Sequence, residues 1–144
     1  MCIRDRLANK GEIFYAKGKD KNVNPMLMAS IAMHETQGNS KVLKECNNVG
    51  GINWDGDKTA KRKGRYRVYS SIDDSINHLA YILSEHYIKK GRTSIESIGA
   101  VYCPLNDPDN GKWGMDNSIW VPNVTKIYQG ILNDVMISNA EEAR

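Results

Sequence analysis

The most constraining feature of this sequence is a glutamate, Glu35, that falls in line with apolar residues in the stretch Asn24–Trp54. Met28, Ile31, Ala32 and Glu35 are spaced i, i+3, i+4 and i+7, so an α-helix places all four on one face. A carboxyl group on an apolar face is partly desolvated, and desolvation favours its neutral form. A carboxylic acid that is neutral near pH 7 can give a proton to a leaving group. The pattern predicts a general acid, and the alternative is an ordinary solvated helical glutamate.

The residues around Glu35 predict where its helix begins and ends. Asn24 suits the N-cap, and Pro25 suits the first helical position because an N–H at that position has no helical partner. Gly38 is a natural stop after Glu35. A second short helix, Ser40 to Cys46, should follow, with its first residue as the cap.

A glycine turn and a β-hairpin are expected next. Gly50 and Gly51 permit backbone conformations that a side chain would block. The stretch from Trp54 to Tyr69 alternates as strands do, around a turn at Gly64. Its basic residues form either a solvated tip, which is the commoner case, or a surface that touches anionic polymer. These residues are Lys58, Lys61, Arg62, Lys63, Arg65 and Arg67.

The remaining helices surround these elements in one expected domain, residues 7–137. The clearest helix starts at Ser71, which forms a capping box with Asp74. Residues 1–6 are expected to be a non-native or disordered leader, and residues 138–144 a disordered tail. The first helix should start near Leu7 and end at Gly18 and the polar run Lys19–Asn22. The other expected helices run from Ser71 to Lys89, from Thr93 to near Tyr102, and from Val121-Pro122 to the tail that starts at Ser138.

Four segments resemble, in the same order, the motifs of the bacterial glucosaminidase family of peptidoglycan hydrolases, which is glycoside hydrolase family 73-like. HETQGNS is similar to E-[ST]-x-x-G-x-S, with one residue fewer before its glycine, and the following NNVGGINW is similar to N-N-[FVI]-x-G-[IL]. YRVYSSIDDSINHLAYIL and IGAVYCP resemble two later passages of the family. The resemblance runs from about Val23 to about Tyr128. It implies a mainly α (α+β) lysozyme-like domain with a small β-hairpin lobe, acting on glycan strands of the bacterial cell wall.

The family's motifs imply roles at the matching positions. Glu35 corresponds to the catalytic acid, and Tyr102 to a tyrosine that orients the sugar or the attacking group. A half-buried core tyrosine is the alternative for Tyr102. In the family the glycine turn lines the sugar groove, while the tryptophans contact sugar only if they are exposed. The expected substrate-binding residues are Asn48, Gly50, Gly51, Asn53, Trp54, Tyr69, Trp113 and Trp120.

The sequence departs from the family in its second acid, which there is commonly a glutamate in the β-lobe. Residues 54–71 contain no glutamate, so Asp57 is the candidate second catalytic residue, beside Asp55. Both also fit ordinary turn aspartates. A lytic transglycosylase route therefore stays open, in which the sugar's own C6 hydroxyl attacks. Two non-catalytic functions also compete: a wall-binding module, and a nucleic-acid-binding domain, for which the sequence carries no recognisable signature.

Composition and charge narrow the expected partners. No run among the 144 residues approaches the ~18 apolar residues that cross a membrane, and the net charge of +3 is too small to argue for nucleic acid. No cluster has zinc spacing, and Asp107–Gly111 lacks the closing glutamate of a calcium loop, so we expect no metal and no cofactor. Cys2, Cys46 and Cys103 are expected to be free thiols, and the alternative is a Cys46–Cys103 pair.

We expect a monomer that binds bacterial peptidoglycan, with no nucleic acid and no membrane insertion. It should act outside the cell or in the cell wall, either secreted or as a phage lysis or tail protein. No signal peptide is visible in the sequence.

Overall fold

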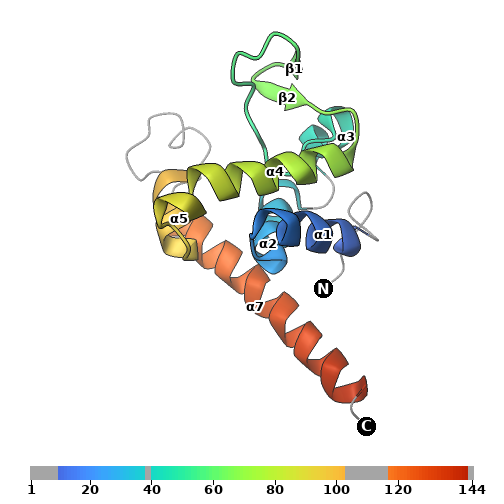
Figure 1. Cartoon of the computed structure of the whole chain (residues 1–144), viewed down its shortest axis with the longest axis vertical. Coiled ribbons are helices and arrows are strands. Elements are labelled where there is room, and N and C mark those ends of the chain that lie inside the picture. The colour runs from blue at the N-terminus through green and yellow to red at the C-terminus, as the bar shows by residue number, and fades with distance from the viewer. Residues whose placement is uncertain (1–9, 38–39, 103–116, 143–144) are drawn as a thin grey trace.

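Helix α2 (Pro25–Thr36) lies at the centre of a fold that a computed structural model describes for residues 10–37, 40–102 and 117–142. Helices predominate and one two-stranded sheet forms a small lobe, which confirms the mainly α fold class (Figure 1). Within these residues, no helix combines the length and apolarity needed to cross a bilayer. The other elements are α1 (Gly11–Lys21), α3 (Lys41–Cys46), β1 (Lys61–Lys63), β2 (Tyr66–Val68), α4 (Ile72–His86), the 3-10 helix η2 (Ile88–Lys90), α5 (Ile95–Tyr102) and α7 (Asn117–Glu142).

The predicted start of α2 is confirmed, and its end is one residue earlier than glycine chemistry suggested. The Asn24 side chain accepts a hydrogen bond from the Met26 N–H at 2.9 Å, and Pro25 occupies the first helical position. Gln37 adopts the left-handed conformation that ends the helix and donates its N–H to the Met33 carbonyl at 2.7 Å. Gly38 lies outside the described residues.

Helix α2 is buried on nearly all sides, whereas the sequence predicted a single buried stripe. Eight of its 12 residues are buried, and α1 and α7 both pack against it. Small residues allow this close packing, and two buried hydroxyls are satisfied within the helix itself. Ser30 donates to the Met26 carbonyl at 2.6 Å, and Thr36 donates to the Ala32 carbonyl at 2.7 Å. Nearly complete burial makes α2 a rigid base for Glu35.

Helix α1 ends within the predicted polar run Lys19–Asn22 and not at Gly18 itself. The helix continues to Lys21, and Asn22 caps it in a left-handed conformation. A Cβ at Gly18 would lie 2.6 Å from the Val23 carbonyl oxygen and 3.2 Å from the Met28 sulfur. The glycine is therefore needed where α1 meets the start of α2.

The predicted hairpin is confirmed. Strands β1 and β2 pair antiparallel with Lys61 opposite Val68, and Gly64 makes the turn with φ of +60°. The Tyr69 N–H donates to the Cys46 carbonyl at 2.8 Å, so the end of the hairpin is tied to α3. Cys46 is a buried free thiol, as expected.

Helix α4 lies between the hairpin and the pair α1 and α2 (Figure 1). Its N-cap is Ser71, whose side chain accepts from the Asp74 N–H at 3.1 Å, as the capping box predicted. The α-helix ends at His86 and not at Lys89, because the chain tightens into η2 and turns at left-handed Gly91. The predicted inward residues are Ile72, which is half-buried, and Ile76, Leu79, Ala80, Leu83 and Tyr87, which are buried.

Ser94, and not the predicted Thr93, caps the start of α5. The Ser97 N–H donates to the Ser94 hydroxyl oxygen at 3.1 Å, and the Ser94 N–H donates to the Ser97 hydroxyl oxygen at the same distance. This reciprocal pair satisfies two N–H groups that the first helical turn leaves without partners.

Helix α7 begins at Asn117, four residues before the predicted start, and contains Pro122. The proline removes one helical hydrogen bond, but the earlier start places Trp120 on a helix that packs against α2 and α5. Trp120 is fully buried. The helix continues through Glu142, past the expected start of the tail at Ser138, and its last turns project away from the other helices (Figure 1).

Candidate active site

The Glu35 side chain lies in the last turn of α2, with its carboxyl group between α7 and the glycine turn. Burial is the largest influence on this carboxyl and raises its pKa to about 7. The residue is only partly exposed, while Met28, Ile31 and Ala32 of the same stripe are fully buried. At neutral pH a large share of the Glu35 carboxyl groups therefore carry a proton.

Trp120 holds the Glu35 carboxyl from the α7 side. Its indole Nε1–H donates to Oε1 of Glu35 at 3.1 Å, which opposes the effect of burial and lowers the pKa. Sugar binding was expected of Trp120, but its side chain is fully buried and has no face free for a sugar. Its role is to hold the acid.

Three neighbours fix the position of the Trp120 ring. Tyr102 stacks on it with ring centroids 5.3 Å apart, and His34 meets it edge-on at 6.2 Å. A Cβ at Gly99 would lie 3.0 Å from the Trp120 ring, so the glycine lets α5 approach α7 closely. His34 is buried, burial lowers its pKa, and its Nε2 has no hydrogen-bond partner among the described residues.

The glycine turn faces the other carboxyl oxygen of Glu35. Gly51 adopts φ of +60°, and a Cβ at this position would lie 3.3 Å from Oε2. Because Gly51 has no side chain, only main-chain atoms lie beside the Glu35 carboxyl on this side. The Tyr102 hydroxyl donates to the Gly50 carbonyl at 2.8 Å, so Tyr102 braces both the turn and Trp120.

Asn48 holds the turn and cannot touch a substrate, which corrects its predicted role in sugar binding. Its side chain is fully buried, and its amide N–H groups donate to the carbonyls of Ile52 at 2.8 Å and Arg67 at 3.0 Å. Its amide oxygen accepts from the N–H groups of Ile52 at 2.9 Å and Gly50 at 3.3 Å. All four hydrogen-bonding positions of the amide are thus used.

Asp55 and Asp57 are placed as turn residues of the hairpin lobe. Asp57 accepts from the N–H and the hydroxyl of Thr59 at 2.9 and 2.7 Å, and these bonds lower its pKa. Asp55 accepts from the Asp57 N–H at 3.0 Å. Arg67 lies 3.6 Å from a carboxyl oxygen of each. Both acids therefore have local partners that account for their positions.

The other predicted substrate-binding residues are spread along the hairpin lobe. The Trp54 indole donates to the Asp57 carbonyl at 2.9 Å, and the Arg62 guanidinium lies 4.8 Å from its ring centroid. Asn53 is exposed beside Tyr66. Tyr69 is buried, and its hydroxyl is hydrogen-bonded to Nδ1 of His78. Trp113 and the loop Asp107–Gly111 lie outside the described residues, as do Cys2 and Cys103.

Two neighbours of Glu35 had no signal in the sequence. The positive charge of Arg65, from the hairpin turn, acts on Glu35 and lowers its pKa. His34 touches Trp120 from the position next to Glu35. Only contacts between segments far apart in the chain reveal these influences. Within the described part of the chain, no group of three or more His, Cys, Asp or Glu side chains could hold a metal ion.

A partly buried carboxylic acid at the end of a buried helix, beside the turn that leads into a small β-lobe, resembles the arrangement in lysozyme-like glycoside hydrolases. The sequence profile of the Glucosaminidase family, described as mannosyl-glycoprotein endo-beta-N-acetylglucosaminidase, matches residues 11–134. The chain therefore belongs to the glucosaminidase family and is a glycoside hydrolase of the peptidoglycan-degrading type, which confirms the resemblance seen in the motifs. A comparison with curated proteins found no match.

Proposed function

We propose that this protein cleaves β-1,4 glycosidic bonds in the glycan strands of bacterial peptidoglycan, as an endo-β-N-acetylglucosaminidase with Glu35 as its single general acid. The observation that carries the proposal is the partly buried Glu35 carboxyl, whose pKa of about 7 keeps a proton available at neutral pH. The family to which the chain belongs supports the same substrate class.

The two carboxyl oxygens of Glu35 have different surroundings, which assigns the proton. Oε1 accepts the Trp120 indole N–H, while Oε2 lies on the side of Gly51. Oε2 is therefore the oxygen that carries the proton and donates it to the glycosidic oxygen. The bond from that oxygen to C1 then breaks, and positive charge develops on the sugar ring.

Two routes complete the reaction from this point. In hydrolysis, water adds to C1 and gives a proton to the Glu35 carboxylate, so that a reducing end forms. In the lytic transglycosylase alternative, the sugar's own C6 hydroxyl adds to C1, and the Glu35 carboxylate takes its proton. The transglycosylase route needs no second carboxylate. It stays an alternative because the hydrogen bonds of Asp55 and Asp57 within their own turn account for both acids without a catalytic role.

The deciding experiment is mass analysis of the fragments that wild type and Glu35→Gln release from purified cell wall. Hydrolysis adds one water per cleavage, and transglycosylation gives anhydro ends that are lighter by one water. We expect Glu35→Gln to lose a factor of roughly 10² to 10⁴ in rate, the usual contribution of a general acid. Glu96→Gln, an exposed glutamate on α5, is the matched control and should keep full activity.

The outcomes separate the proposal from its alternatives. A Glu35→Gln variant that still degrades the wall would remove Glu35 from the catalytic role. A wild-type protein that sediments with peptidoglycan but releases no fragments would instead be a wall-binding module. A peptidoglycan substrate implies action outside the cell or in the cell wall, by secretion or through a phage. We also propose that the protein acts as a monomer, without nucleic acid or cofactor.

A further inference from the structure

A cavity of about 620 Å³ is lined by the hairpin region, by α4 and by Lys21 at the end of α1, and Glu35 is not part of its lining. Its volume is in the range of small-ligand sites. None of Glu35, Gly51 and Trp120 lines it, although the buried Tyr69, one of the residues expected to bind substrate, does. The residues that carry the argument are Lys21, Lys61, Arg67, Asp74, His78 and Tyr81.

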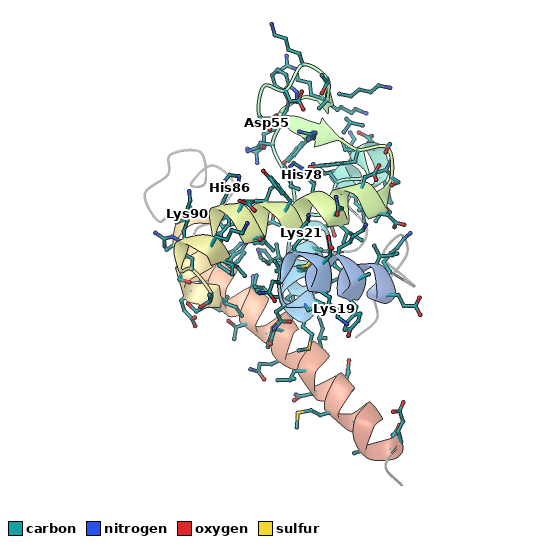
Figure 2. The ribbon with its side chains drawn as sticks, in the orientation of Figure 1. Lys19, Lys21, Asp55, His78, His86 and Lys90 are labelled. Carbon is teal, nitrogen blue, oxygen red and sulfur yellow. The ribbon has the colours of Figure 1, made fainter. Side chains whose placement is uncertain are left out.

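Helix α4 separates this cavity from the glycine turn. Leu79 is fully buried, and its Cδ1 would lie 3.2 Å from a Cβ at Gly50, so this face of α4 points toward the turn. Asp74, His78 and Tyr81 are spaced i, i+4 and i+7 and lie on the opposite face of the helix. Figure 2 shows His78 on the side of α4 that faces the hairpin. The cavity is therefore distinct from the candidate active site.

Three cationic side chains from three elements meet at this cavity. Lys21 ends α1, Lys61 begins β1, and Arg67 lies on β2. Lys21 lies 3.7 Å from exposed Asp20, and Lys61 forms no ion pair with any residue that the structure describes. Figure 2 shows Lys21 between α1 and α4.

Acidic groups offset only part of this charge. Asp74 is the one acidic residue of the lining, and its carboxylate accepts a hydrogen bond from the Ser70 hydroxyl. Asp55 and Asp57 partly offset Arg67, each at 3.6 Å. Counted by its lining alone, the cavity holds three cations and one carboxylate, while Asp20 and Glu85 lie near Lys21 outside that lining.

An aromatic wall completes the cavity. Tyr81 is 46% exposed and stacks on His78, with ring centroids 6.1 Å apart and an interplanar angle of 22°. Burial lowers the pKa of His78, and the charge of Arg67 lowers it further, so the imidazole is uncharged at neutral pH. An uncharged aromatic face beside fixed cations suits a sugar ring that bears an anionic group.

We propose that this cavity binds an anionic saccharide unit of the bacterial cell wall and anchors the enzyme at a point separate from the bond that it cleaves. The sugar ring lies against Tyr81, and Lys21, Lys61 and Arg67 bind its carboxylate or phosphate. The carboxylate would come from the peptide-bearing glycan strand, and the phosphate from a phosphodiester polymer attached to the wall. Naming the wall as the source rests on the proposed function.

The test compares two double variants that remove the same charge. Lys21→Gln/Lys61→Gln changes the cavity, while Lys19→Gln/Lys58→Gln removes one exposed lysine each from α1 and the hairpin region without touching it. Both are made in Glu35→Gln protein, so that the wall stays intact during sedimentation. Each partly exposed ion pair contributes a factor of about two to five, so we expect the cavity variant to bind roughly tenfold more weakly than its control.

Two further arms identify the anion and separate this site from catalysis. Walls stripped of phosphodiester polymer keep the difference between the variants if the ligand is a carboxylate, and lose it if the ligand is a phosphate. With Glu35 restored, both double variants should cleave short soluble glycan fragments as fast as wild type. Equal wall binding by the two double variants would overturn the anchoring site. The same holds if the two variants differ more in their affinity for duplex DNA than in their affinity for wall. If wild type does not cleave the soluble fragments at all, the proposed function is overturned instead.

Discussion

The two lobes of this domain hold carboxyl groups in opposite environments. In the helical lobe, burial raises the pKa of Glu35 to about 7. In the hairpin lobe, the hydroxyl and N–H of Thr59 bind the Asp57 carboxylate and hold its pKa below the usual range. The same functional group is therefore an acid in one lobe and a fixed anion in the other. The comparison teaches that surroundings, not residue type, decide which carboxyl can give a proton.

The largest expected effect is a change in how stability depends on pH. The pKa of Glu35 is raised from 4.5 to about 7, so the folded protein binds this proton more tightly than the unfolded chain. The free energy of unfolding of wild type should then fall between about pH 4.5 and 7, by at most roughly 3 kcal/mol. Glu35→Gln removes the titration and should gain stability over wild type as the pH rises. Urea unfolding at pH 5 and pH 8 measures this.

Asp57→Asn is the contrasting control for that measurement. The pKa of Asp57 is lowered, so its stabilising contribution is present above the unfolded pKa and is lost only as the solution becomes strongly acidic. Its effect on stability should be the same at pH 5 and pH 8. If Glu35→Gln behaved in the same way, the carboxyl of Glu35 would not be desolvated.

The second prediction concerns the indole that holds the acid. Trp120→Phe removes the hydrogen bond to Oε1 that lowers the pKa of Glu35, so the high-pH limit of activity should move upward. A hydrogen bond to a charged group contributes about 1.5–3 kcal/mol, which corresponds to a shift of roughly one pH unit or more. The rate of wall lysis between pH 5 and 9 reports this limit.

Trp54→Phe provides the matched comparison in the hairpin lobe. Its indole also donates one hydrogen bond, but to the main-chain carbonyl of Asp57. This variant should leave the pH limits of lysis unchanged. An equal shift in both variants would mean that the change does not pass through Glu35.

The third prediction tests the glycine beside the acid. Gly51→Ala places a side chain in a left-handed conformation, at a cost of about 1–2 kcal/mol, and crowds Oε2 of Glu35 at 3.3 Å. Gly64→Ala is the control, because Gly64 has the same φ of +60° with no atom within 4 Å of its Cβ position. Thermal unfolding should show similar losses for both, whereas the turnover rate of lysis should fall only for Gly51→Ala. A rate loss of equal size in Gly64→Ala would contradict a specific role for Gly51.

The smallest expected effect is that of Asp57→Asn on activity. Its carboxylate is fully engaged by a turn at the protein surface, so we expect the rate of lysis to fall less than about fivefold. Fragment release from purified wall measures it. A loss of a hundredfold or more would instead identify Asp57 as the residue that positions water, and would bring the two lobes into one catalytic pair.

Local chemistry made several parts of this fold predictable from the sequence. Three helix starts could be predicted because a capping side chain acts within a few residues of its own position. These starts are marked by Asn24 with Pro25, by Ser40, and by Ser71 with Asp74. The hairpin turn could be predicted from the backbone freedom of Gly64. The apolar stripe that includes Glu35 could be predicted from the helical spacing of its residues. The ordered family motifs added the substrate class.

The parts that the sequence did not predict depend on contacts between distant segments. Gly18 reads as a helix stop, yet α2 requires its small size. Pro122 is typical of a helix start, but α7 already begins at Asn117, and Trp120 on this earlier part of the helix is buried in the core. The hydrogen bond between Trp120 and Glu35 joins residues 85 positions apart, so no local pattern could indicate it. The family motif predicts a substrate contact for Asn48, and only its burial in the fold shows that it supports the turn.

The amide of Asn48 has a mechanical consequence for the two lobes. It joins the glycine turn to β2, while the Ser75 hydroxyl of α4 accepts the Val49 N–H at 3.0 Å in the same junction. Hinge motion at this point would break several buried hydrogen bonds at once. We therefore expect any bending of the hairpin to be confined to its tip around Gly64, while the Glu35 carboxyl and the adjoining turn keep their positions.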